Sequence, residues 1–238
     1  MKNTPHFDNH PLLFSQTLGY PPLRGSVICI CVPVEFRDHL FDQVEKVQFT
    51  EAFYKAKRYL EKTAERADIA LKITPLILPP IRVEKPCFDK LELMYDALKQ
   101  LLNRYDSVSI SSLKRLLKLK LNNRNVQADV IDILFVSPLT NAISQAISHY
   151  SGYGPGEDNY CCIYKDPAYS SETIEHELLH LHGAVDLYPP QYIHTALAIL
   201  GSSIMECNSK RIDPLTSHLI GWSDLDERAA EFLAKTSS

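Results

Sequence analysis

The segment TIEHELLHLHGAVDLY, residues 173–188, combines an apolar helical pattern with closely spaced metal-binding side chains. His176 and His180 are four positions apart, so on a helix both imidazoles project from one face and can bind one metal ion. Gly183 can end that helix and turn the chain, which brings Asp186 round as a third ligand. Three protein ligands leave one coordination position open, as in catalytic rather than structural zinc sites. The segment therefore predicts one catalytic Zn²⁺ ion.

Glu177 follows the first predicted ligand, where its carboxylate can accept a proton from water bound to the metal. We predict that Glu177 is the general base. A solvated helix face rich in His and Glu is the simplest alternative, but leucines fill the positions between the polar residues. Polar groups on such a buried helix are costly unless they have partners, and a metal ion supplies one. His182 lies off the ligand face, and the pattern leaves open whether it is a plain polar residue or one that supports the site.

Met205 lies in the segment GSSIMECN, downstream of Asp186. A tight turn with a methionine beneath the metal ligands accompanies the zinc motif in metzincin peptidases. The pattern HELLHLHGAVD followed by SIM therefore resembles the metzincin superfamily, and most closely the branch whose third ligand is Asp. The resemblance implies an α/β (α+β) fold with a twisted mixed sheet, an active-site helix, the Met-turn and C-terminal helices. It also implies a zinc-dependent endopeptidase whose partner is a protein or peptide substrate.

One position departs from the family pattern. Many metzincins carry a tyrosine two residues after the turn methionine, where this chain has Cys207. The tyrosine that helps to stabilise the oxyanion is therefore missing there. Tyr188, just after the third ligand, and His182 are both candidates to replace it, and the sequence does not decide between them.

The zinc motif leaves two other functions open. The chain could be a catalytically silent zinc-binding module that recognises a partner protein without cutting it, although the intact Glu177 argues against this. It could also be a metal-dependent hydrolase of a non-peptide amide or ester, because the motif alone does not fix the substrate.

Composition limits the other classes of function. The chain has 238 residues, of which 45% are hydrophobic, enough to bury one sizeable core. Its formal net charge of −4 gives no electrostatic reason to expect nucleic acid or an anionic membrane as a partner. The first residues lack the features of a secretory signal, and no apolar run approaches the ~18 residues of a membrane span. We therefore expect a cytoplasmic protein.

The six cysteines are expected to be free thiols in a reducing compartment. None belongs to a C-x-x-C pair, so a separate structural zinc is not expected. Cys161 and Cys162 are adjacent in a predicted strand and should face opposite sides of a sheet. Cys87 could reach the zinc as an inhibitory thiolate, as a cysteine does in some metzincin proforms, although the residues around it do not match that motif. Cys207 adjoins the Met-turn, where packing is its favoured role.

The chain divides into two predicted parts. Residues 1–24 are proline-rich with few periodic apolar positions, which favours an extended N-terminal arm rather than a core element. Residues 25–238 are predicted to form a single metzincin-like catalytic domain. The family pattern does not require the two helical segments at about 86–126, so we interpret them as an insertion that could cover or gate the cleft.

Hydrophobic periodicity predicts an alternation of strands and helices. Strands are expected at 26–36, 70–83, 130–137 and 160–165, and helices at 50–67, 88–105 and 109–122. The pattern of residues 139–151 is ambiguous but suits a helix. In metzincins an edge strand near this point pairs with the extended substrate, so the loop 151–159 and its flanks are the predicted rim of the cleft.

Capping residues predict where several helices begin or end. Thr50 is the predicted cap of the first long helix, and Ser170 or Ser171 can cap the helix of the zinc motif. Asp213 followed by proline should open a helix that Gly221 closes. A last helix is then expected from a cap at Ser223 through Leu233.

Overall fold

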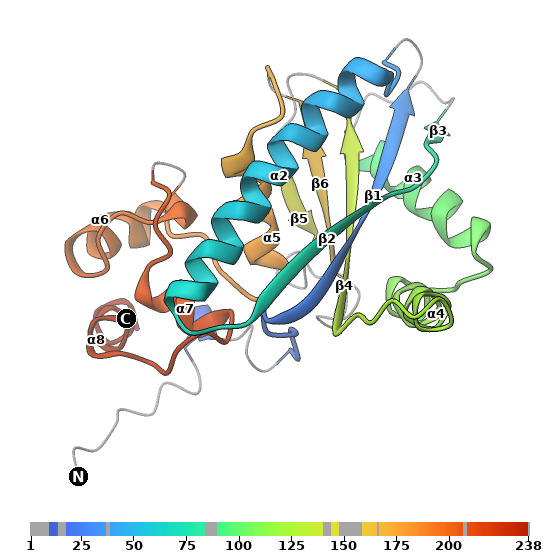
Figure 1. Ribbon diagram of the computed structural model, residues 1–238. Coiled ribbons are helices and arrows are strands. Elements are labelled where there is room, and N and C mark those ends of the chain that lie inside the picture. The colour runs from blue at the N-terminus through green and yellow to red at the C-terminus, as the bar shows by residue number, and fades with distance from the viewer. Residues whose placement is uncertain are drawn as a thin grey trace.

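The structure is a computed structural model that describes residues 10–13, 18–36, 39–83, 90–139, 144–147, 159–165, 167–206 and 209–237, with the backbone alone at 90–93 and 145–147. Within these residues it is a mixed α/β protein built around a twisted sheet (Figure 1). The fold class expected from the sequence is therefore confirmed at this level.

The sheet has the strand order β2-β1-β4-β6-β5, with β3 paired to the end of β1. All neighbouring strands are parallel except β5, which runs antiparallel to β6 at the edge. The sheet is thus mixed, as expected. The strands are β1 (Gly25–Phe36), β2 (Leu71–Ile77), β3 (Ile81–Val83), β4 (Val130–Ser137), β5 (Gln145–Ile147) and β6 (Tyr160–Tyr164).

Helices cover both faces of this sheet (Figure 1). The α-helices are α2 (Gln43–Arg66), α3 (Lys90–Arg104), α4 (Ile110–Asn122), α5 (Ser171–Leu181), α6 (Pro190–Ile199), α7 (Pro214–Leu219) and α8 (Glu227–Thr236). Two short 3-10 helices are η1 (Pro11–Leu13) and η4 (Ile204–Glu206). Helix α6 was not predicted from the sequence.

Side chains of the central strands alternate between two buried cores. Cys29 and Cys31 of β1 face the core that includes α2 and α5, whereas Ile28 and Ile30 face the core that includes α3 and α4. A parallel strand buried on both faces is uniformly apolar, which explains the run VICICV. Cys161 and Cys162 also divide between the two cores, as predicted, and these four described cysteines are free and buried.

The helical insertion forms a complete layer on the sheet. Leu101 of α3 and Leu113 and Leu117 of α4 are buried against the sheet face opposite to α5. The described part of residues 86–126 thus packs on the sheet face opposite to α5, and the interpretation of these residues as an insertion that could cover or gate the cleft stays a prediction.

The described part of residues 1–24 belongs to the core. Leu12, Leu13 and Leu23 are buried with the C-terminal helices. The Leu23 backbone N–H donates to the Ile220 carbonyl at 3.0 Å, and the Trp222 indole N–H donates to the Leu23 carbonyl at 2.5 Å. The sequence had suggested an arm outside the core, but these residues are part of the core.

Four boundaries differ from those expected. Helix α2 begins early because Asp42, not Thr50, caps it by accepting from the Glu45 N–H at 2.9 Å. The predicted strand 70–83 is split into β2 and β3. Residues 145–147 form a strand rather than a helix, and Asp226, not Ser223, caps the last helix.

Candidate metal centre

Helix α5 carries the two histidines of the predicted metal site, His176 and His180. Ser170 caps the helix, its side chain accepting from the Thr173 N–H at 3.3 Å, as one of the two predicted caps. Leu178 and Leu179 anchor the helix in the core. One turn apart on its other side, the rings of His176 and His180 have centroids 4.6 Å apart and planes at 89°.

The chain turns directly after the helix at Gly183. Its φ of +96° lies in the left-handed region, which glycine adopts without steric cost. The turn is fixed by hydrogen bonds from the Gly183 N–H to the His180 carbonyl and from the Ala184 N–H to the Leu179 carbonyl, both 3.1 Å. The chain then returns along the helix, which brings Asp186 to the histidines as the spacing predicted.

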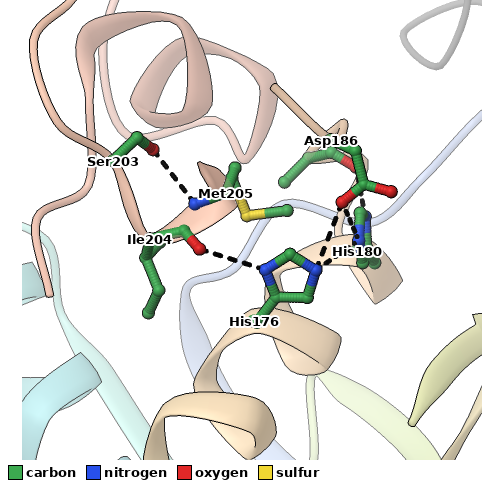
Figure 2. A network of polar contacts seen from close by, with 7 residues as sticks. His176, His180, Asp186, Ser203, Ile204 and Met205 are labelled. Atoms are coloured by element: carbon green, nitrogen blue, oxygen red, sulfur yellow. Dashed lines mark hydrogen bonds and ion pairs between the residues drawn. The ribbon is translucent and has the colours of Figure 1, made fainter. Parts of the chain in front are cut away.

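Three ligand atoms converge at the centre (Figure 2). The Nε2 atoms of His176 and His180 are 3.1 Å apart, and Asp186 Oδ1 lies 3.2 Å from the first and 3.1 Å from the second. Within the described residues, no other group of three His, Cys, Asp or Glu side chains has metal-binding spacing. His176, His180 and Asp186 can therefore hold a metal ion.

Backbone carbonyls fix the protonation of both imidazoles. His176 Nδ1 lies 3.1 Å from the Ile204 carbonyl oxygen, and His180 Nδ1 lies 2.8 Å from that of Ala184. A carbonyl oxygen only accepts, so each Nδ1 carries a proton, and Nε2 is the ring atom left to bind a metal ion. This is the orientation in which metal-ligating histidines are held. The two Nε2 atoms and the carboxylate oxygen of Asp186 can therefore bind one cation together.

Asp186 is held in its ionised form. Burial by itself raises the pKa of this carboxyl, but hydrogen bonds and positive charge from His176 and His180 outweigh it and hold the pKa well below its ordinary value. The carboxylate is the form that ligates metals.

The predicted Met-turn is the 3-10 helix η4, and it contacts both ends of the ligand set. Its Ile204 carbonyl accepts from His176, while its Met205 carbonyl accepts from the Leu187 N–H at 3.0 Å, one residue after Asp186. Met205 is fully buried, and Figure 2 shows its side chain beside the His176 imidazole.

Glu177 is buried, with 3% of its surface exposed. Burial, and then the charge of Glu177, raises the pKa of the Cys161 and Cys162 thiols, so the carboxylate lies close to β6. Its position in the chain, one residue after His176 and three before His180, keeps it on the helix segment that carries both ligands.

His182 lies in the core and not in the metal site. It is fully buried at the end of α5, where Nδ1 lies 2.8 Å from the Pro21 carbonyl oxygen and Nε2 3.1 Å from Asp132 Oδ2. Both ring nitrogens are occupied in the core, so oxyanion support from His182 is excluded. Tyr188, 46% exposed and two residues after Asp186, stays the predicted candidate for that role.

Asp132 was missed by the sequence analysis, although one signal was available. It is the single charged residue in the buried strand VIDILFVS, and a charge in such a strand needs a buried partner. Cys87, Cys207 and the loop 151–158, for which roles near the zinc or the substrate were considered, lie outside the described residues.

None of the helices in the described ranges combines the length and apolar character needed to cross a membrane. Comparisons of the chain with protein family models, with curated proteins and with solved structures found no match.

Proposed function

We propose that this protein is a zinc-dependent endopeptidase of the metzincin type, with His176, His180 and Asp186 as zinc ligands and Glu177 as general base. The observation that carries the proposal is the triangle of three ligand atoms, each 3.1–3.2 Å from the other two. The motif and the buried methionine turn beside that triangle support it.

The triangle fits zinc. Bonds of about 2.0–2.2 Å to tetrahedral zinc place neighbouring ligand atoms about 3.3–3.5 Å apart. The three distances here are slightly shorter, so only a small outward movement of the side chains is needed to admit the ion. Two imidazoles and one carboxylate form a ligand set typical of catalytic zinc, with one position left for water or substrate.

Glu177 is proposed to move the protons. When bound, zinc would act as a Lewis acid towards the peptide carbonyl and lower the pKa of a water molecule to about 7. The Glu177 carboxylate accepts the proton of the attacking water and then delivers it to the leaving amine nitrogen, so the base is restored at the end of each cycle.

The edge of the sheet supports a peptide as the substrate. Strand β5 is antiparallel to β6 and ends the order of the described strands, so no described strand pairs with its other side. An extended peptide can add to such an edge through main-chain hydrogen bonds. A small non-peptide amide cannot add to a sheet edge as a strand. The edge strand therefore favours a peptidase over a hydrolase of non-peptide amides.

The test maps new protein N-termini in a cell lysate treated with zinc-loaded protein. We expect wild type to generate new termini and Glu177→Gln to generate none while keeping its zinc, because the base contributes about 10²–10⁴-fold to the rate. His176→Ala and His180→Ala should lose zinc as well. Glu175→Gln, the same change at the neighbouring buried residue of α5, is the matched control and should cut like wild type.

Two outcomes would contradict the proposal. Equal cleavage by Glu177→Gln and wild type would remove Glu177 from the mechanism. Zinc binding without any new termini, tested again on a panel of small amides, would favour the non-peptide hydrolase if the amides are cut and the silent binding module if they are not.

A further inference from the structure

Asp213 and Ser203 form a fully buried polar pair behind the metal centre. The Ser203 hydroxyl donates to Asp213 Oδ2 at 2.5 Å, and the Thr216 hydroxyl donates to the same oxygen at 2.5 Å. The other oxygen, Oδ1, accepts from the backbone N–H groups of Leu215 and Thr216 and so caps α7. The carboxylate therefore accepts four hydrogen bonds, more than a helix cap requires.

Asp213 determines the direction in which Ser203 points. A serine hydroxyl has one proton, and here that proton is directed to Asp213. Its oxygen lone pairs are then free to accept from the Met205 N–H, at 3.1 Å (Figure 2). Without Asp213, nothing in this set of bonds would fix the rotation of the hydroxyl.

The backbone that Ser203 holds is the backbone that contacts the ligands. The Ile204 carbonyl accepts from His176 Nδ1, and the Met205 carbonyl accepts from the Leu187 N–H. The Ile204 N–H in turn donates to the Arg211 carbonyl at 2.7 Å. A continuous path therefore runs from Asp213 through Ser203 and the backbone of η4 to the first ligand and to the residue after the third. Figure 2 shows its central part, from Ser203 through Met205 and Ile204 to His176.

We propose that Asp213 is a positioning residue of the metal centre, acting through Ser203 on the backbone of η4. It holds the Ile204 carbonyl where it keeps His176 protonated at Nδ1 and aims Nε2 at the metal. The inference rests on the zinc site of the proposed function. Groups that orient a ligating histidine in this way typically change metal affinity 10–100-fold when they are removed.

The competing explanation is that Asp213 only stabilises α7 as its cap. Asp226 offers a matched comparison, because it caps α8 by accepting from the Ala229 N–H at 2.8 Å and has no hydrogen bond to η4. Asparagine keeps an oxygen that can cap a helix, so both Asp213→Asn and Asp226→Asn should retain their caps. A loss of positioning should appear in Asp213→Asn alone.

The experiment measures the zinc dissociation constant by competition with a chromogenic chelator, together with the visible spectrum of the Co²⁺-substituted protein. We expect Ser203→Ala and Asp213→Asn to raise the dissociation constant 10–100-fold and to shift the Co²⁺ bands. Asp226→Asn should match wild type in both. Ser203→Ala keeps the α7 cap intact, so it decides the question if Asp213→Asn does not fold.

Three results would overturn the inference. One is wild-type zinc affinity and an unchanged Co²⁺ spectrum in Ser203→Ala. Another is an equal loss of affinity in Asp226→Asn, which would assign the effect to cap stability. Absence of zinc binding by wild type would overturn the metal centre and this inference together, whereas zinc binding without peptidase activity would contradict the proposed function alone.

Discussion

In each imidazole of the metal centre, the two ring nitrogens face different partners. Nε2 faces the ligand triangle and Nδ1 faces a backbone carbonyl. For His180 that carbonyl is Ala184, four residues away on the turn after α5, whereas for His176 it is Ile204, in a separate element. The orientation of His180 is therefore set locally, while that of His176 depends on the tertiary placement of η4.

Glu175 gives a prediction about stability and pH. Burial, and then the charge of Glu172, raises its pKa to about 8, against the opposing charge of Lys210. The folded protein then holds a proton that the unfolded chain, with a glutamate pKa of about 4.3, has released. The free energy of unfolding contributed by this group is thus present at low pH and lost as pH rises from about 4.3 to 8, at most about 1.4 kcal/mol per pH unit.

Glu175→Gln should therefore be more stable than wild type, by a margin that grows between pH 5 and pH 8. Urea unfolding of the metal-free proteins at several pH values measures this margin, and metal-free protein is needed because a bound cation would change the charges near the helix. Glu51→Gln, at an exposed position of α2, is the control and should show no such trend. A margin that stays constant with pH would contradict the prediction.

The ligand residues were predictable from spacing, but their supports were not. His176, His180 and Asp186 follow from helix periodicity and one glycine turn, which are local rules. The buried Asp132 and Asp213, for example, have hydrogen-bond partners that are 50 and 10 residues away in the chain. No local rule identifies such partners, because they meet only when the sheet and the helices pack.

Among the secondary-structure elements, α4 shows how much the insertion contributes to the fold. Its Leu113 is fully buried against the sheet, whereas Leu119 on the same helix is 65% exposed. We expect Leu113→Ala to lower the free energy of unfolding by about 2–5 kcal/mol, because it leaves a cavity in a packed layer. Leu119→Ala should change it by less than about 0.5 kcal/mol.

Guanidinium unfolding of both variants measures this difference. Zinc affinity at low denaturant should be unchanged in either, because α4 packs on the sheet face opposite to α5. Similar small effects of the two substitutions would mean that α4 contributes little to the stability of the fold.

The elements that were predicted well have strong local signals. β1 and β4 are long apolar runs, and α4 has the Ser109 capping box with Ser112. Errors arose where tertiary pairing decided the outcome. Residues 145–147 have an apolar spacing that suits a helix but pair with β6 as an edge strand, and this pairing depends on a neighbour that no short-range pattern reveals.

On the scale of the whole molecule, the N-terminal segment closes against the C-terminal helices. Gly221 lies at this junction with φ +78°, and a Cβ built there would be 2.8 Å from the Pro22 Cβ. Gly19 has a similar φ of +72° but open space around it. We expect Gly19→Ala to lower the free energy of unfolding by about 1–2 kcal/mol, because alanine disfavours this backbone conformation. Gly221→Ala should lower it by the same amount and by about 1–3 kcal/mol more, because of the clash with Pro22.

Thermal or urea unfolding of the two variants separates these contributions. Because the two φ angles are similar, the difference between the variants reports the contact between Pro22 and residue 221. Equal destabilisation would show that the N-terminal segment can move away without loss, and that its buried leucines contribute little to the stability of the fold.

The contacts between residues 10–24 and the C-terminal helices can form only late in synthesis, because they join segments far apart in the chain. His10 Nε2 lies 3.2 Å from Thr236 Oγ1, across 226 positions of the chain, and Leu23 bonds to Ile220 and Trp222. A ribosome adds about 5–20 residues per second, so residues 10–24 wait many seconds for their partners. The three metal ligands likewise exist before Ser203 and Asp213 have been made. We therefore expect the nascent chain to acquire its metal-binding geometry late in translation, after the histidines themselves have left the ribosome.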